Sequence, residues 1–152
     1  MQGERREIDV LLRAAEVAPD TVAVRLGSRA LTYWELRNEV ARIARKLSGI
    51  GVTRRDVIAL LMDNAVEFVA GYFAIHWLGG IAMPLNPKEP AERLQYCLTR
   101  AGARTILVRT DADAKRAPAS TLTGATFLAL DGIPPSDFES SDANSQAQAE
   151  KV

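Results

Sequence analysis

Residues 56–85 read DVIALLMDNAVEFVAGYFAIHWLGGIAMPL, and this stretch decides the fold. It opens with a continuous apolar run of strand length, which is typical of a parallel strand covered on both faces. Residues 66–78 are apolar nearly all round, which requires a helix buried on more than one side. Gly79 and Gly80 then lead into a short apolar strand that Pro84 is expected to stop. The order strand, helix, strand predicts a right-handed crossover within a parallel sheet.

The apolar helix looks at first like part of a membrane span. Glu67 and His76 lie within residues 65–85, however, and a glycine pair and a proline break the run. We therefore expect a buried helix in a soluble domain. Asp63 and Asn64 come just before this helix, and we expect them to cap it.

The alternation of helices and strands continues downstream. Pro90 suits the first turn of a helix over residues 91–101, which Gly102 ends. The segment ARTILV, residues 103–108, indicates another buried strand. A weak helix and a last strand follow, at residues 111–115 and 125–130. We predict an α/β fold with a mostly parallel sheet flanked by helices.

Three smaller elements precede the sheet. Residues 8–17 place their apolar side chains on one helix face. The segments TVAVRL and ALTY alternate apolar and polar residues around residues 27–29, which predicts a small N-terminal β-hairpin. Thr32 and Glu35 are spaced as a capping box, so a helix is expected over residues 33–48.

Length and composition suit one domain with a substantial core. The chain has 152 residues, of which 47% are hydrophobic, and its 19 basic side chains balance 19 acidic ones. Zero net charge argues against a nucleic-acid partner. The single cysteine, Cys97, and the lack of a zinc-type cluster indicate a reducing, cytoplasmic setting. We assign residues 1–130 to the domain and residues 131–152 to a polar linker or disordered tail.

Two segments invite a ligand-binding interpretation, but a structural one is favoured for each. Residues 49–51 read GIG, yet they follow a helix, and Arg54 stands where a dinucleotide fingerprint needs its third glycine. A helix end with a turn is the favoured interpretation. Asp111 and Asp113 follow a predicted strand, where two carboxylates could hold magnesium. Capping of the next helix by Asp111 is favoured.

The histidine and the aromatic residues also have structural interpretations. His76 is the only histidine, which excludes a histidine pair for a metal, and we interpret it as a satisfied interior polar group. Aromatic side chains could form a ligand box, but their helical spacing favours packing. These residues are Tyr33, Trp34, Tyr72, Phe73 and Trp77.

Basic residues offer two candidate anion contacts. The densest group consists of Arg42, Arg45, Lys46, Arg54 and Arg55. A solvated helix face is the favoured interpretation of this group, because the chain has no net charge and no aromatic residues interleave with it. Lys88 lies in a proline-rich loop beside the expected sheet end and is the best-placed lone cation.

Two motifs connect the chain to a known superfamily. LTYWEL, residues 31–36, matches the first core motif of adenylation domains, and LGGIAMPLN, residues 78–86, resembles the second. The sequence therefore resembles the N-terminal subdomain of the adenylate-forming enzymes. This superfamily includes acyl-CoA and aryl-CoA ligases, the adenylation domains of nonribosomal peptide synthetases, and luciferases. The Pro-Leu-Asn-Pro form is more similar to the acyl-CoA and aryl-CoA ligase branch.

The resemblance implies an ATP-dependent carboxylic acid–thiol ligase that acts through an acyl-adenylate. For the complete enzyme it implies ATP, magnesium and coenzyme A or carrier pantetheine. The family's phosphate loop, metal motifs and catalytic lysine lie downstream of residues like these, so we assign no catalytic, cofactor-binding or metal-binding residue. We expect this chain to be inactive alone and to act with the remainder of the ligase, in cis or in trans.

Two other interpretations stay open. The chain could be a standalone non-catalytic interaction module or a truncated pseudoenzyme, which would associate through exposed apolar surface. It could also be an unrelated doubly wound ligand-binding domain that uses the strand ends near Asn64, Asn86 and Asp111. Tight nucleotide binding by the chain alone would favour this last interpretation.

Overall fold

The computed structural model describes residues 6–132, which form two sheets. The larger sheet has four parallel strands in the order β4-β3-β5-β6. Their bounds are Val57–Leu61 for β3, Ile81–Leu85 for β4, Thr105–Val108 for β5 and Thr126–Ala129 for β6. The smaller sheet is an antiparallel hairpin of β1 (Val22–Leu26) and β2 (Arg29–Thr32). The predicted α/β class, parallel sheet and N-terminal hairpin are confirmed.

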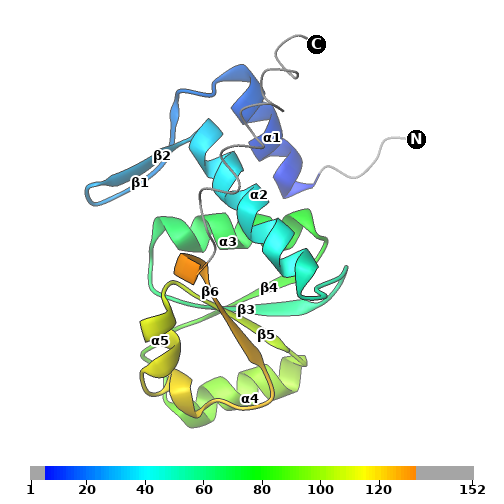
Figure 1. Ribbon diagram of the computed structural model, residues 1–152, viewed down its shortest axis with the longest axis vertical. Coiled ribbons are helices and arrows are strands. Elements are labelled where there is room, and N and C mark those ends of the chain that lie inside the picture. Colours follow the sequence, from blue (N-terminus) through cyan, green and yellow to red (C-terminus); the bar gives the residue numbers. More distant parts are fainter. Residues whose placement is uncertain (1–5, 133–152) are drawn as a thin grey trace.

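Helices cover both faces of the parallel sheet. Their bounds are Glu7–Val17 for α1, Tyr33–Gly49 for α2, Val66–Trp77 for α3, Ala91–Ala101 for α4 and Asp111–Lys115 for α5. Two 3-10 turns follow, η1 (Ala119–Thr121) and η2 (Leu130–Gly132). Figure 1 shows α3 and α4 on opposite sides of the sheet, with α2 and α1 stacked beyond α3. Within residues 6–132, no helix has the length and apolar character needed to cross a membrane.

Strand β3 is buried on both faces, as its continuous apolar sequence predicts. Ile58 and Leu60 belong to the core cluster that includes α1, α2 and α3. Ala59 and Leu61 belong to a second cluster, which Leu94 of α4 joins from the other side. Because successive side chains of a strand point to opposite faces, the single strand β3 contributes to both clusters. The neighbouring strand β5 does the same, with Leu107 in the first cluster and Ile106 and Val108 in the second, so the two cores share the central strands β3 and β5.

The glycine pair after α3 serves two different needs. Gly79 has φ 75°, a left-handed conformation that favours glycine, and its N–H donates to the His76 carbonyl at 3.0 Å. A Cβ on Gly80 would lie 3.1 Å from both the Asp56 carbonyl oxygen and the Ile75 side chain. The first glycine thus ends the helix, and the second lets β4 begin close to β3 and α3.

Pro84 does not stop β4, contrary to the sequence prediction. The strand continues through Leu85, and Pro84 is aligned with Leu60 of β3. Proline lacks an N–H, so a strand tolerates it only where that nitrogen faces away from a neighbouring strand. β4 lies at the edge of the sheet, which meets this condition.

The predicted capping box at the start of α2 is confirmed. The Glu35 N–H donates to Thr32 Oγ1 at 3.1 Å, and the Thr32 N–H donates to Glu35 Oε1 at 2.9 Å. These two bonds satisfy backbone donors that would otherwise lack partners at a helix start.

Two other helix starts differ from the predictions. Ala65, not Asp63 or Asn64, occupies the N-cap position of α3, and it makes no side-chain capping bond. The backbone of Ala65 is extended, which leaves Asn64 and Asp63 outside the cap position. Pro90 is the N-cap of α4 and not part of its first turn, and Gly102 ends α4 in the left-handed conformation, as predicted.

The described fold continues beyond residue 130. The Asp131 N–H donates to the Arg109 carbonyl at 3.2 Å, and Asp131 Oδ1 accepts the Asp111 N–H at 3.1 Å. These bonds fasten η2 to the start of α5. The rest of the segment that the sequence assigns to a linker or tail, residues 133–152, lies outside the described residues.

A polar contact fastens α1 to α3. Tyr72 donates a hydrogen bond to the Glu7 carboxylate, and this bond, together with burial and the negative charge, raises the pKa of Tyr72. His76 Nε2 lies 3.6 Å from Glu7 Oε2, and the His76 ring contacts the Tyr72 ring at 4.4 Å between centroids. His76 therefore has a polar partner as predicted, but its side chain is 29% exposed and not interior.

We expect Thr32→Ala to lower the free energy of unfolding by about 1 kcal/mol, because the Glu35 N–H loses its side-chain acceptor. Thr32→Ser keeps a hydroxyl and should stay close to the parent. Urea unfolding followed by circular dichroism measures both variants. Equal stability of the alanine and serine variants would contradict a stabilising role for the cap.

We expect Glu7→Ala to lower the pKa of Tyr72 toward its ordinary value, because the charged acceptor is removed. A raised tyrosine pKa adds stability that is complete below the unfolded pKa of about 10 and is lost as pH rises through the folded pKa. The parent should therefore lose more stability than the variant above about pH 10. Tyrosinate absorbance, with Tyr72→Phe to assign the transition, measures the shift.

Glu16→Ala is the matched control for this experiment, since Glu16 is also an exposed glutamate of α1. An unchanged Tyr72 transition in Glu7→Ala would show that the hydrogen bond does not control the titration.

Candidate functional site

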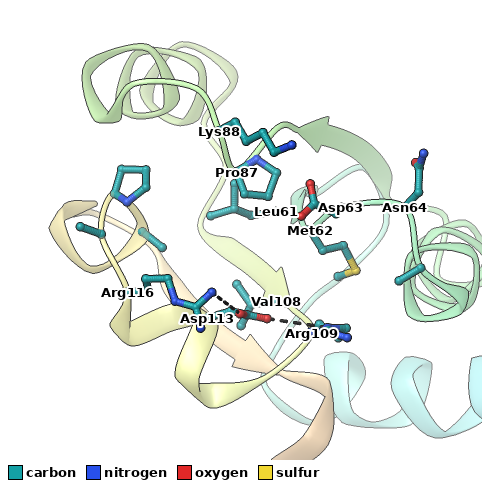
Figure 2. Close-up of a pocket in the computed structure, with 14 residues that line it drawn as sticks. Leu61, Met62, Asp63, Asn64, Pro87, Lys88, Val108, Arg109, Asp113 and Arg116 are labelled. Atoms are coloured by element: carbon teal, nitrogen blue, oxygen red, sulfur yellow. Dashed lines mark ion pairs between the residues drawn. The ribbon is translucent and has the colours of Figure 1, made fainter.

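A cavity of about 410 Å³ opens at the carboxyl edge of the parallel sheet. Its walls come from the ends of β3 and β5, the loop after β4, and α5 with the segment that leads to η1. Its polar lining residues are Asp63, Asn64, Lys88, Arg109, Asp113 and Arg116. This edge is where open α/β sheets bind ligands. Figure 2 shows Lys88 and Asp63 on one side of the cavity and Asp113 with its two arginines on the other.

The proline-rich loop after β4 forms one rim of the cavity. Asn86 Oδ1 accepts the Lys88 N–H at 2.9 Å, and the Asn86 carbonyl accepts the Glu89 N–H at 3.0 Å. An asparagine side chain that bonds the backbone two residues ahead forms a compact turn. Pro87 and Lys88 at this turn line the cavity. The loop therefore positions Lys88 at the sheet edge, as the sequence suggests.

The opposite wall depends on the start of α5, where the predicted cap is wrong. Thr110, not Asp111, is the N-cap: its Oγ1 accepts the Asp113 N–H at 3.2 Å. Asp113 Oδ2 accepts the Thr110 N–H at 3.3 Å, which completes a capping box. Asp111 lies one position inside the helix, and its carboxylate pairs with Lys115 at 2.7 Å and raises the pKa of that lysine.

Asp113 also faces two arginines of the cavity. Its Oδ1 lies 3.7 Å from Arg116 Nη1, and its Oδ2 lies 3.9 Å from Arg109 Nε. Figure 2 shows this carboxylate between the two guanidinium groups. Arg109 follows β5 directly, and Arg116 follows α5, so one carboxylate links two elements of the wall.

The lining of the cavity carries a net charge of +1, since three cations face two carboxylates. The cations are Lys88, Arg109 and Arg116, and the carboxylates are Asp63 and Asp113. Lys88 makes no ion pair with any residue from 6 to 132. This arrangement suits an anionic group such as a phosphate.

The described residues show no preformed cluster of metal ligands. Among residues 6–132, no group of three or more histidine, cysteine, aspartate or glutamate side chains could hold a metal ion. Asp111 and Asp113 face different cations and do not act as a pair. The magnesium interpretation of these two residues therefore finds no support in the geometry.

The dense basic group does not contribute to the cavity. Arg42 is only 12% exposed, forms an ion pair with Glu39, and donates to the Leu130 carbonyl at 3.4 Å. The predicted solvated face is therefore wrong for Arg42, which lies where α2 meets the end of β6. Arg45, Lys46, Arg54 and Arg55 are exposed and lie outside the lining.

The other candidates have structural roles. Tyr33, Tyr72, Phe73 and Trp77 pack against the core cluster of α1, α2 and α3, as their spacing predicts. The Arg37 guanidinium lies 5.0 Å from the Trp34 ring. Gly51 has φ 98° in the turn after α2, so the helix-end interpretation of residues 49–51 is confirmed. Cys97 is a half-buried free thiol.

Sequence reasoning found Lys88, Asp113 and Asn64 near the sheet edge but missed Asp63, Arg109 and Arg116 as lining residues. Asp63 and Arg109 each come shortly after a buried strand, and that position is a usable signal. Arg116 follows a short helix, and nothing in its local sequence indicates the cavity.

Comparison with known proteins identifies the family. The sequence profile of a family described as "AMP-binding enzyme" matches residues 11–152. Gramicidin S synthase 2 of Brevibacillus brevis is 36% identical over 94 residues, which are 62% of this chain and 2% of that protein. Phosphinothricin tripeptide synthetase PhsC of Streptomyces viridochromogenes is 35% identical over 100 residues, which are 66% of this chain and 9% of that protein.

Solved structures share the fold. VinN matches with a TM-score of 0.78 at 22% identity, over 88% of this chain and 33% of its own. The fatty acid AMP ligase from Legionella pneumophila matches with a TM-score of 0.78 at 20% identity, over 89% of this chain and 25% of its own. This chain thus spans a third or less of each of these four proteins. By its family match and by the N-terminal subdomain fold that it shares with these enzymes, the chain belongs to the AMP-binding, adenylate-forming enzyme family.

Proposed function

We propose that this chain supplies the N-terminal part of an ATP-dependent carboxylic acid–thiol ligase of the acyl-CoA or aryl-CoA synthetase type. Such an enzyme converts an acid and ATP to an acyl-adenylate and pyrophosphate, and then passes the acyl group to a thiol. The family match supports the adenylate-forming step. The observation that supports coenzyme A as the thiol acceptor is the cavity with its three cations.

The cavity suits coenzyme A better than a carrier pantetheine arm, which has a single phosphodiester charge. Coenzyme A carries an adenosine 3′,5′-bisphosphate, whose phosphates need positive partners. The volume of about 410 Å³ lies in the range of small-molecule sites. Lys88 and Arg116 lie on opposite sides of the cavity and would hold phosphate oxygens, while Arg109 adds a third positive charge to the lining. The Pro-Leu-Asn-Pro form of the loop that carries Lys88 agrees with this choice.

We assign no chemical step to a residue of this chain. The adenylation step needs positive charge and magnesium at the α-phosphate. We expect ATP and the metal to bind in the complete enzyme, because the family match concerns AMP-binding enzymes of which this chain spans only a part. In this proposal the chain contributes an acceptor-binding surface and part of the scaffold, in a cytoplasmic setting.

The partner in this proposal is the remainder of the ligase, in cis or in trans.

One observation also favours the second candidate function, an interaction module. Two apolar side chains lie exposed on one face of α1, seven residues apart: Val10 at 66% and Val17 at 71%. Self-association at high protein concentration, measured by analytical ultracentrifugation, would support that candidate.

We expect the purified 152-residue chain to release no pyrophosphate from ATP and magnesium with any member of a panel of carboxylic acids and amino acids. The reason is that the chain spans 33% of VinN and 25% of the Legionella ligase. A coupled pyrophosphate assay, validated with an intact ligase, tests this expectation. Acid-dependent release above the blank would overturn it.

We expect the chain to bind adenosine 3′,5′-bisphosphate saturably and to bind adenosine far more weakly. Lys88→Gln should weaken bisphosphate binding about fivefold, because one cation of the lining is lost. Lys115→Gln is the matched control, since Lys115 pairs with Asp111 outside the lining. Isothermal titration calorimetry at low salt measures both variants. Equal affinities for adenosine and the bisphosphate would exclude a phosphate site.

A further inference from the structure

Asp113 has two separable roles in the wall of the cavity. The first role is structural: Asp113 Oδ2 accepts the Thr110 N–H at 3.3 Å and thereby completes the capping box of α5. The second role is electrostatic: the same carboxylate lies 3.7 Å from Arg116 Nη1 and 3.9 Å from Arg109 Nε. Capping needs only an oxygen acceptor, whereas pairing with the arginines needs the negative charge.

We propose that Asp113 is an internal counter-ion that competes with an anionic ligand for Arg116 and Arg109, and so weakens the binding of phosphates in the cavity. This inference rests on the proposed function, because it assumes that the cavity binds a phosphate. A ligand phosphate that contacts Arg116 must replace Asp113 as the partner of that guanidinium.

The geometry favours competition over rigid positioning. Both contacts are longer than a charge-assisted hydrogen bond of about 2.7–2.9 Å, so the carboxylate does not lock either guanidinium in place. The side chains of Arg116 and Arg109 are 74% and 53% exposed and can therefore turn toward a ligand. Asp113 itself is 26% exposed, so it stays at the wall while the arginines move.

The charge of the lining leads to the same conclusion. With Asp113 ionised, the net charge is +1, and loss of this carboxylate would raise it to +2. Lys88 lies on the other side of the cavity, the side of Asp63, and forms no ion pair among residues 6–132, so a ligand need not displace a paired carboxylate from it. The thiol acceptor must bind and its product must leave in every turnover. A moderate affinity of the cavity for phosphates, which the Asp113 charge would maintain, suits this cycle.

Asp113→Asn isolates the electrostatic role, because asparagine keeps an oxygen that can accept the Thr110 N–H. The matched control is Asp111→Asn, which removes the same charge two residues away, where the carboxylate pairs with Lys115 outside the cavity. Asp113→Ser is a second variant that removes the charge and keeps an acceptor. Thermal unfolding verifies that each variant is folded.

The experiment measures the affinity of the chain for adenosine 3′,5′-bisphosphate by calorimetry, with adenosine as the uncharged probe. We expect Asp113→Asn to tighten bisphosphate binding about two- to fivefold, and Asp111→Asn to leave it unchanged. Adenosine binding should change in neither variant. In an Arg116→Gln background the gain from Asp113→Asn should shrink, because the group for which Asp113 competes is gone.

Weaker or unchanged bisphosphate binding in both Asp113→Asn and Asp113→Ser would overturn the inference, and weaker binding would mean that Asp113 positions the arginines. An equal gain in Asp111→Asn would also overturn it, because the effect would then come from net charge alone. If the parent chain and all variants fail to bind the bisphosphate, the phosphate site itself fails. The two proposals can thus be told apart.

Discussion

Burial of β3 on both faces is the constraint on which the rest of the structure depends. Ile58 and Leu60 belong to the core under α3, whereas Ala59 and Leu61 belong to the core over α4. A strand without a polar face can exist only between two helical layers, so the chain must cross from one side of the sheet to the other. Gly80, which follows α3, lets β4 begin close enough to pair with β3.

The same constraint creates the cavity. A strand buried along its whole length can carry polar side chains only beyond its ends, and Asp63 lies just past the carboxyl end of β3. Arg109 lies just past the end of β5, which is the neighbour of β3 in the sheet. The loop after β4 brings Lys88 to the same edge. Polar groups distant in sequence therefore meet because the apolar interior of the sheet excludes them.

Local sequence patterns predicted the elements better than the contacts between them. The box of Thr32 and Glu35 was predictable because both partners lie within four residues. Asp111 was the wrong cap because the neighbouring threonine forms the same kind of box with Asp113, and the alternatives differ by one residue. The burial of Arg42 over the end of β6 depends on tertiary packing that no local pattern records. The pairing of Asp113 with Arg116, in contrast, joins residues only three apart in the sequence.

Pro84 has a consequence for the direction in which the sheet can grow. β4 and β6 are the two outer strands among residues 6–132, and only β4 contains a proline. The missing N–H of Pro84 interrupts the row of donors that an added strand would need, and this protects the β4 side from edge-to-edge association. The β6 side, residues 126–129, keeps an N–H at every position. Further strands, whether from the same polypeptide or from another, can therefore extend this sheet in one direction more readily than in the other.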